Sequence, residues 1–163
     1  MRAHIFKALA VLAASVTCAA APATGLDAEK WVAAHPAVGV LTAETVLTVE
    51  APGTTLDDFH WTARPLVVFA DSADDPRFIQ QMEFIARDGA ELAARDVIVV
   101  VDTDPAAGSA LREELRPRGF MLVLIGKDGF KYLRKPRPWN VREISRSIDK
   151  MPLRQQEVKD ARR

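Results

Sequence analysis

The sequence has 163 residues, of which 48% are hydrophobic and 27% are charged. This length and composition suit one soluble globular domain with a short extra segment, and they exclude two ordinary domains. Basic and acidic side chains number 22 each, so the formal net charge is zero. The charge balance therefore gives no reason to expect nucleic acid or an anionic membrane as a partner.

The first 23 residues have the pattern of a secretory signal peptide. Arg2 and Lys7 flank the start of an apolar, alanine-rich run over residues 8–21, and alanines near its end provide Ala-x-Ala spacing for cleavage. The run is too short to span a bilayer and no later segment replaces it. We therefore expect export to the periplasm or the extracellular space, without a transmembrane segment.

Cys18 is the single cysteine of the sequence and lies inside the predicted signal peptide. A lipoprotein would be acylated at such a cysteine, but the Ser-Val-Thr run before it does not match the small residues that lipidation sites use. A soluble product is therefore favoured. Without residues 1–23 the chain has no cysteine, which excludes disulfides and both thiol oxidoreductase and peroxidase chemistry.

Residues 24–55 are expected to form an N-terminal extension before the main domain. The composition of residues 24–36 predicts a short helix with Asp27 as its N-cap, and Trp31 suits an anchor that packs this segment onto the domain. Residues 38–49 are rich in β-forming side chains and predict one or two edge strands.

The main domain is expected over residues 56–152 and is organised around its first strand. Residues 56–61 are expected to form a short helical or irregular lead-in to that strand. Residues 66–70 are a continuous apolar run, typical of a strand buried on both faces. A polar turn over residues 71–75 follows, and Asp75 with the proline after it is typical of a helix start. Apolar residues then recur on one helix face, namely Phe78, Ile79, Met82, Ile85, Ala86, Gly89, Leu92 and Ala93.

A second strand and helix repeat this pattern. Residues 97–101 are another apolar run and are followed by an acidic turn that contains Asp102 and Asp104. The proline after Asp104 predicts a helix that continues to Leu115. Residues 120–125 then predict a third buried strand.

The last part of the domain has the signals of a hairpin and a closing helix. Asp-Gly at 128–129 is typical of a turn that leads into an antiparallel edge strand over residues 130–134. Asn140 is expected to cap a helix over residues 141–150. Residues 153–163 are expected to form a charged C-terminal tail, either as a solvated helix or as a frayed end.

The order of these elements predicts an α/β, thioredoxin-like fold of the form βαβαββα. Its first strand would be central in a mixed sheet, with helices flanking both faces. A flavodoxin-like chain begins in the same way, but it would continue with a helix where this sequence has a hairpin.

Short motifs in this domain resemble the family of domains of unknown function numbered 4174. The resemblance covers about residues 56–158, and its positions include Trp61, Arg64, Phe69, Arg95, Asp96, Lys127, Asp128, Gly129, Asp149, Met151, Pro152, Arg154 and Glu157. The family is also described as peroxiredoxin-like with a thioredoxin-like fold, and it includes small secreted bacterial proteins and domains of vertebrate secreted matrix proteins. No activity is attached to it, so the resemblance implies a fold and a compartment and no reaction.

Structural roles account for most of these family positions. Lys127 and Asp128 suit the hairpin turn. Trp61 and Met151 suit packing between the two ends of the domain. The arginine and the glutamate at the end of the resemblance are three residues apart, which is the spacing of an ion pair on one helix face.

The turn after the first strand is where thioredoxin-like enzymes carry reactive cysteines. Here the turn has no thiol, and Gly119 stands where those enzymes place a cis-proline. Parallel strands should bring several polar residues to one edge of the sheet. These residues are candidates for binding a ligand or a cation, and they are Asp71, Ser72, Asp74, Asp75, Asp102 and Asp104. Their oxygen atoms would suit Ca²⁺ or Mg²⁺. The simpler explanation is that Asp75 and Asp104 cap helices and that the other residues solvate their turns.

Other catalytic arrangements are disfavoured. Ser72 with His60 as its base lacks the surrounding motif of a hydrolase. Outside the signal peptide the sequence has two histidines and no cysteine, which does not suit a zinc site, and no cofactor is expected.

Two functional hypotheses follow from the sequence. The leading one is a secreted, non-redox, thioredoxin-like module, expected to be monomeric, that binds a protein, a peptide or another extracytoplasmic ligand. The alternative is a metal-assisted enzyme that uses the acidic edge of the sheet.

Overall fold

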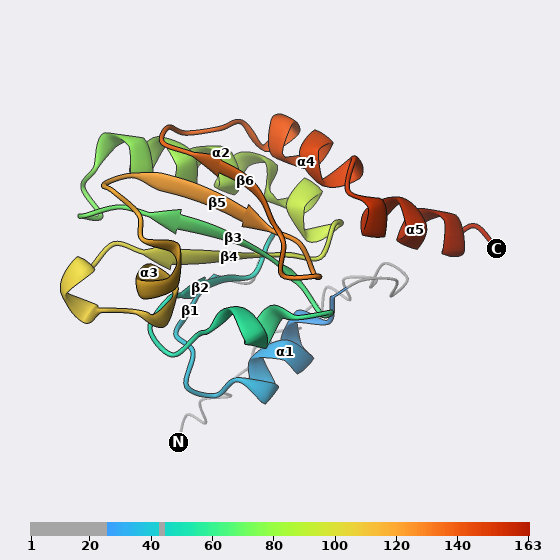
Figure 1. The fold of residues 1–163 in the computed structure, drawn as a ribbon, viewed down its shortest axis with the longest axis horizontal. Coiled ribbons are helices and arrows are strands. Elements are labelled where there is room, and N and C mark those ends of the chain that lie inside the picture. The colour runs from blue at the N-terminus through green and yellow to red at the C-terminus, as the bar shows by residue number, and fades with distance from the viewer. Residues whose placement is uncertain (1–25, 43–44) are drawn as a thin grey trace, which may run out of the picture.

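The computed structural model describes residues 26–42 and 45–163, so the predicted signal peptide with Cys18 lies outside the described residues. In this part of the chain six strands form one mixed sheet in the order β1-β2-β4-β3-β5-β6 (Figure 1). The strands are β1 (Val40–Thr42), β2 (Thr48–Glu50), β3 (Arg64–Phe69), β4 (Val97–Asp102), β5 (Met121–Ile125) and β6 (Lys131–Lys135). An α/β fold with a mixed sheet is therefore confirmed.

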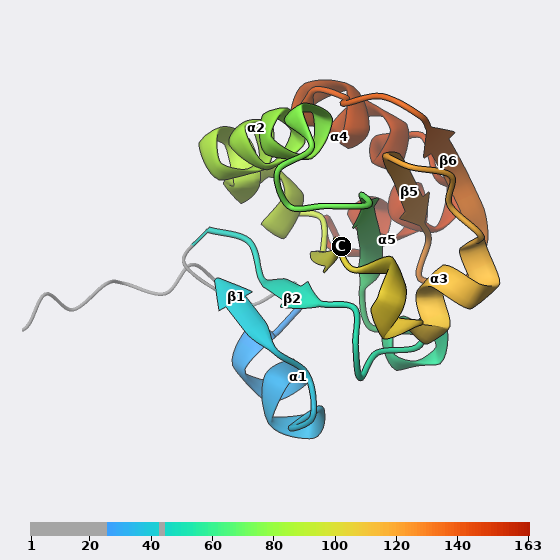
Figure 2. The same cartoon turned by 90° about the vertical axis from the view of Figure 1, so that its left-hand side faces the viewer.

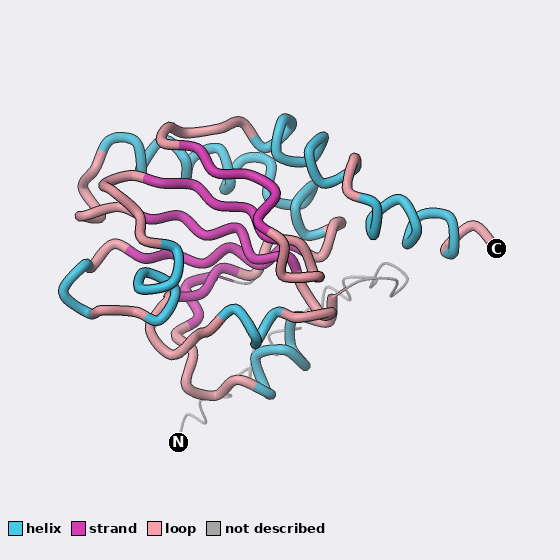
Figure 3. Tube along the Cα trace, viewed as in Figure 1, coloured by secondary structure: helices cyan, strands magenta, loops and turns pink. Residues whose placement is uncertain are grey.

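Within the described residues the chain also forms five α-helices and two short 3-10 helices. Figure 3 shows how they lie around the strands. They are α1 (Ala28–Ala34), η1 (Leu56–Phe59), α2 (Pro76–Ala93), η2 (Pro105–Ala107), α3 (Ala110–Leu115), α4 (Val141–Asp149) and α5 (Pro152–Asp160). Over the same residues, no helix has both the length and the apolar character needed to cross a membrane.

The central position of β3 agrees with the prediction for the first strand of the domain. β3 pairs with β4 in parallel and with β5 in antiparallel orientation, and β6 follows as the antiparallel edge. The N-terminal extension adds its two strands to the same sheet. Of these two strands only β1 lies at an edge of the sheet, because β2 lies between β1 and β4 and pairs with β4 in parallel.

Each face of the sheet carries its own hydrophobic core. Leu66 and Val68 of β3 belong to the core under α2 and α4, whereas Val67 and Phe69 belong to the core that includes Leu111 of α3 and residues of α1. Figure 2 shows these two pairs of helices on opposite sides of the sheet. All of β3 is buried, as expected of a strand covered on both faces.

The α1 helix packs the N-terminal extension onto the core that contains Val67 and Phe69, as predicted for Trp31. Asp27 caps α1 by accepting a hydrogen bond from the Lys30 backbone N–H at 3.0 Å. Trp31 is buried and stacks on Phe59, with ring centroids 5.3 Å apart, and on His35 at 4.1 Å. The extension is therefore part of the same folded unit as the main domain.

The buried face of α2 matches the predicted one in part, because Ile85, Gly89 and Leu92 are buried and Phe78 and Met82 pack against the core. Ile79 is 45% exposed, whereas Gln81, which no apolar pattern would select, is fully buried. The Gln81 side chain accepts a hydrogen bond from the Trp139 N–H at 2.7 Å and donates one to the Trp139 carbonyl at 3.1 Å. These two bonds satisfy the buried amide. Non-helical backbone angles at Asp88 mark a kink within α2.

The second predicted helix is divided in two. Asp104 caps η2 by accepting from the Ala106 N–H at 2.9 Å, and Gly108 then adopts a left-handed conformation with φ of 56°. Ser109 provides a new cap, since its hydroxyl accepts from the Arg112 N–H at 3.1 Å. The left-handed glycine ends the first turn, and α3 begins only at Ala110.

The ends of the domain follow the predictions in part. Residues 153–163, expected as a charged solvated helix or a frayed end, include most of α5, which begins at Pro152 directly after Met151. Met151 is buried, but Trp61 is 68% exposed, so the predicted packing of Trp61 is wrong. The Trp61 backbone has φ of 60°, and its N–H donates to the Lys127 carbonyl at 2.8 Å.

Candidate functional site

The acidic edge lies where β3 and β4 end, and an arginine occupies it. Asp102 pairs with Phe69 in the parallel ladder, and its buried carboxylate accepts hydrogen bonds from the Ser109 hydroxyl and from Arg112. Arg112 Nη2 lies 2.7 Å from Asp102 Oδ1, and Arg112 Nη1 lies 3.7 Å from Asp71 Oδ1. The two carboxylates that the strand register brings to this edge therefore share one cation.

Three of the other candidates at this edge, Ser72, Asp75 and Asp104, bond to the local backbone. Asp75 caps α2 and holds Arg77, and the hydrogen bond from the Arg77 side chain keeps the pKa of Asp75 below its ordinary value. Asp104 caps η2, and the exposed Ser72 hydroxyl accepts from the Asp74 N–H at 3.1 Å. Among the described residues, no three His, Cys, Asp or Glu side chains are placed to hold a metal ion.

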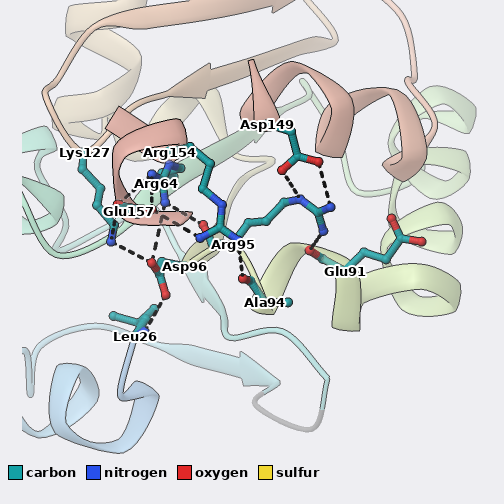
Figure 4. Close-up of polar contacts among 10 residues, drawn as sticks. All are labelled: Leu26, Arg64, Glu91, Ala94, Arg95, Asp96, Lys127, Asp149, Arg154 and Glu157. Atoms are coloured by element: carbon teal, nitrogen blue, oxygen red, sulfur yellow. Dashed lines mark hydrogen bonds and ion pairs between the residues drawn. The ribbon is translucent and has the colours of Figure 1, made fainter. Parts of the chain in front are cut away.

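A cluster of ionised side chains lies elsewhere in the molecule, at the start of β3 and β4 (Figure 4). We call it the charged cluster, and it consists of Arg64, Arg95, Asp96, Lys127, Asp149, Arg154 and Glu157. Every member is one of the positions that carry the family resemblance. The sequence predicted a pair only between Arg154 and Glu157, and the fold brings all seven residues together.

Arg64 is the centre of the charged cluster. Its side chain is 1% exposed, although it is the first residue of an otherwise apolar strand. Arg64 Nη2 donates to both carboxylate oxygens of Glu157 at 2.9 Å, and Nη1 donates to the Arg95 carbonyl at 2.9 Å. Asp96 lies 3.6 Å from Nη1 and gives the buried guanidinium a second counter-charge.

Lys127 joins the same carboxylates from the hairpin between β5 and β6. Its Nζ lies 2.7 Å from Asp96 Oδ2 and 3.1 Å from Glu157 Oε1, so turn chemistry alone does not account for this residue. Asp96 has a left-handed backbone with φ of 55°, and its second oxygen accepts from the Leu26 N–H at 2.6 Å. The cluster thus ties the N-terminal extension to the hairpin.

Asp128, in contrast, acts within the hairpin turn. Its carboxylate accepts from the Phe130 N–H at 3.1 Å and from the Tyr132 hydroxyl at 2.8 Å. Burial and this hydrogen bond raise the pKa of Tyr132 above its ordinary value. Gly129 adopts φ of 76°, which explains why a glycine stands there.

A second pair in the charged cluster links two helices. Arg95 Nε and Nη2 donate to the two oxygens of Asp149 at 2.9 Å each, and Arg95 Nη1 donates to the Glu91 carbonyl at 2.7 Å. The hydrogen bond from Arg95 holds the pKa of Asp149 below its ordinary value. This pair fixes the end of α2 against the end of α4.

Arg154 and Glu157 place α5 over the cluster. Arg154 Nη1 lies 3.3 Å from Glu157 Oε2, as their spacing predicts, and Nη2 donates to the Ala94 carbonyl at 3.2 Å. Burial raises the pKa of Glu157, but hydrogen bonds from Arg64 and Lys127 outweigh burial and leave that pKa below its ordinary value. Glu157 is therefore ionised at neutral pH.

A pocket of about 470 Å³ opens beside the charged cluster. Its lining includes Asp96, Lys127, Arg154, Glu157 and, from the end of the chain, Arg162. Three basic residues thus line it against two acidic ones, and both acidic residues also pair with the buried Arg64.

Two arginines of the pocket retain unused donor capacity. The Nε atom of Arg154 is buried and has no hydrogen-bond partner among the described residues. Arg162 is exposed, and no ion pair joins its side chain to a carboxylate within the same part of the chain. The pocket can therefore offer guanidinium donors to a negatively charged group.

Comparison with known proteins gives a family but no activity. The family model DUF4174, described as a domain of unknown function, matches residues 55–157. The match runs from the cap of η1 into α5 and includes all seven residues of the charged cluster. No curated protein and no solved structure matches the chain.

Proposed function

Because the chain belongs to the DUF4174 family, we propose that it is an exported, non-redox, thioredoxin-like domain that binds an anionic ligand in the pocket beside the charged cluster. Export rests on the signal-peptide pattern of the first 23 residues.

The arrangement of β3 to β6 supports a thioredoxin-like core. The strand order β4-β3-β5-β6, with one parallel and two antiparallel pairings, is the order expected when the first strand of a βαβαββα chain is central. α2 and α4 cover one face of these strands and α3 covers the other. The two N-terminal strands would then be an addition to that core.

The chemistry of the edge after β3 supports a role without redox catalysis. The sequence has no cysteine after residue 18, and the turn after β3 places Asp71 near Arg112. A peroxiredoxin-like activity needs a thiolate at such a position. The domain would therefore use this fold for binding.

The excess of positive charge at the pocket is the observation that carries the proposal. Arg64, Lys127, Arg154 and Arg162 are four basic residues, and Asp96 and Glu157 are the two acidic residues that contact them or line the pocket with them. This leaves two positive charges to be balanced. A carboxylate is the simplest ligand that would balance one of these charges and accept hydrogen bonds from the arginines.

Titration of the purified protein with sodium acetate tests the proposal. Arginine side-chain NMR signals should shift for Arg154 and Arg162, and they should shift more than in sodium chloride of equal ionic strength. Arg162→Ala should weaken the response. Arg142→Ala provides a matched control, because Arg142 is an exposed arginine on α4 that does not line the pocket.

Two results would contradict the proposal. One is a set of acetate shifts no larger than those in sodium chloride. The other is robust insulin reduction or peroxide turnover by the pure protein, which would require redox chemistry that the sequence does not provide.

A further inference from the structure

Exposed aromatic side chains gather next to the pocket. Trp61 is 68% exposed and Phe130 is 64% exposed, and they are the two most exposed large hydrophobic residues in the described chain. His60 lies between them and is 43% exposed. We call these three residues the aromatic surface.

Contacts between two loops make this surface continuous. The His60 and Trp61 rings stack with centroids 6.1 Å apart and planes inclined by 17°. On its other side His60 lies over the hairpin, so close that a Cβ at Gly129 would be 2.7 Å from Nε2. Phe130 follows Gly129 directly and packs edge-on to Tyr132, with centroids 5.0 Å apart.

The aromatic surface borders the pocket on both loops. Thr62, which follows Trp61, lines the pocket, and so does Lys127, whose carbonyl accepts the Trp61 N–H. Trp61 and Asp96 are two of the three non-glycine residues with positive φ in the described chain. Backbone conformations of this kind cost free energy, and they occur more often at binding sites than elsewhere in proteins.

We propose that the ligand of this site is a peptide that presents a carboxylate to the pocket and an aromatic or large aliphatic side chain to Trp61 and Phe130. This inference rests on the proposed function and names the class of ligand. A small molecule would be enclosed by its site, whereas these two rings lie open to solvent. Open aromatic residues with a polar rim, here Asp57 and Asp128, are instead typical of protein and peptide interfaces.

The positive charge of the pocket favours a carboxylate on the peptide. Arg154 and Arg162 favour a carboxylate, which a peptide carries at its C-terminus or on an aspartate or glutamate side chain. The stacked His60 and Trp61 rings offer a flat apolar face for the neighbouring side chain. The peptide would therefore span the boundary between the aromatic surface and the pocket.

A peptide array tests this inference. Random heptapeptides are immobilised through their N-termini, in one copy with a free C-terminal carboxylate and in another with a C-terminal amide, and both are probed with the purified protein. Bound peptides should contain an aromatic or large aliphatic residue near a carboxylate. If the terminal carboxylate is recognised, amidation should weaken binding about tenfold or more. If a side-chain carboxylate is recognised, bound sequences on both copies should contain aspartate or glutamate.

Variants then separate the aromatic surface from the pocket. Trp61→Asn and Phe130→Ser should each weaken the selected peptides about tenfold or more, while the acetate response of Arg154 and Arg162 stays unchanged. Ile79→Ser provides a control, since Ile79 is also exposed, at 45%, but lies on α2. It should leave peptide binding unchanged.

Three results would overturn the inference. They are an array that binds no peptide, bound peptides without any carboxylate, and bound peptides that Trp61→Asn and Phe130→Ser bind as well as the unaltered protein does. If the acetate response persists in these cases, the anion pocket stands and only the peptide assignment fails. If the acetate response is absent as well, the proposed function fails too.

Discussion

Arg64 and Glu157 are 93 positions apart in the sequence, and in the fold Arg64 Nη2 donates a bifurcated hydrogen bond to both carboxylate oxygens of Glu157, at 2.9 Å each. The arginine side chain is 1% exposed and the glutamate side chain 25% exposed. A buried cation needs a counter-charge that is held in place. The last helix is therefore tied to the centre of the sheet through one ion pair.

Glu157→Gln should lower the free energy of unfolding by about 2 kcal/mol, because Arg64 would keep an acceptor but lose its nearest negative charge. Urea unfolding measures this effect. Glu114→Gln is the matched control, since Glu114 forms an exposed pair with Lys131 at 3.2 Å, and its loss should cost less than about 0.5 kcal/mol. Equal effects of the two substitutions would contradict a structural role for the buried pair.

The same residue should contribute to the acid sensitivity of the protein. The pKa of Glu157 is lowered from its ordinary value of 4.5, so its charge stabilises the folded state above that pH. The stability is lost as the pH falls through the lowered pKa. The difference in unfolding free energy between the protein and Glu157→Gln should thus be full at neutral pH and shrink in acid. A difference that stays constant from about pH 7 to about pH 3 would show that the ionised carboxylate is not its source.

At the acidic edge, in contrast, loss of a carboxylate charge should have little effect on stability unless the carboxylate caps a helix. Asp75→Ala should lower the melting temperature through the lost cap of α2, whereas Asp71→Asn and Asp74→Asn should leave it nearly unchanged. Millimolar Ca²⁺ should not raise the melting temperature of any of these proteins, because the Arg112 guanidinium already lies between Asp102 and Asp71 and pairs with Asp102. A calcium-dependent rise that the asparagine variants lose would support the metal-assisted alternative instead.

Export can be tested directly on the secreted product. Mass spectrometry should give an N-terminus between residues 20 and 24 and no lipid, as the signal-peptide pattern predicts. Acyl chains on Cys18 would show that the protein is anchored by lipid.

Local patterns were sufficient to predict most elements of this fold. The apolar runs correspond to β3, β4 and β5, and Asp75 and Asn140 cap the helices that they were expected to begin. Such signals depend on residues that are close in the sequence. The break at Gly108 and the interior place of β2 depend on a turn conformation and on a long-range pairing, and no local pattern encodes them.

The charged cluster could not be predicted for the same reason. Arg64 begins an apolar strand, and its partners lie 31 and 93 positions away. A charged residue at the head of a buried strand was the available signal, because such a residue is seldom buried without a counter-charge. That signal indicates that a partner exists, but it does not identify Glu157.

Trp61 combines a strained backbone with an exposed ring. Substitutions of Trp61 should therefore affect the stability of the protein and its peptide binding in different ways. Trp61→Asn should raise the free energy of unfolding by up to about 1 kcal/mol, because asparagine tolerates a positive φ better than tryptophan does. Trp61→Val loses the same ring but should destabilise the protein by about 1 kcal/mol, since a β-branched residue does not accept this conformation.

Urea unfolding of both variants tests this, with peptide binding measured in parallel. Both should lose affinity for the selected peptides, although their stabilities change in opposite directions. If asparagine and valine destabilise the protein equally, the indole contributes to folding and its exposure is incidental. If stability rises in the asparagine variant while binding falls, Trp61 lowers the stability of the fold and contributes to ligand binding.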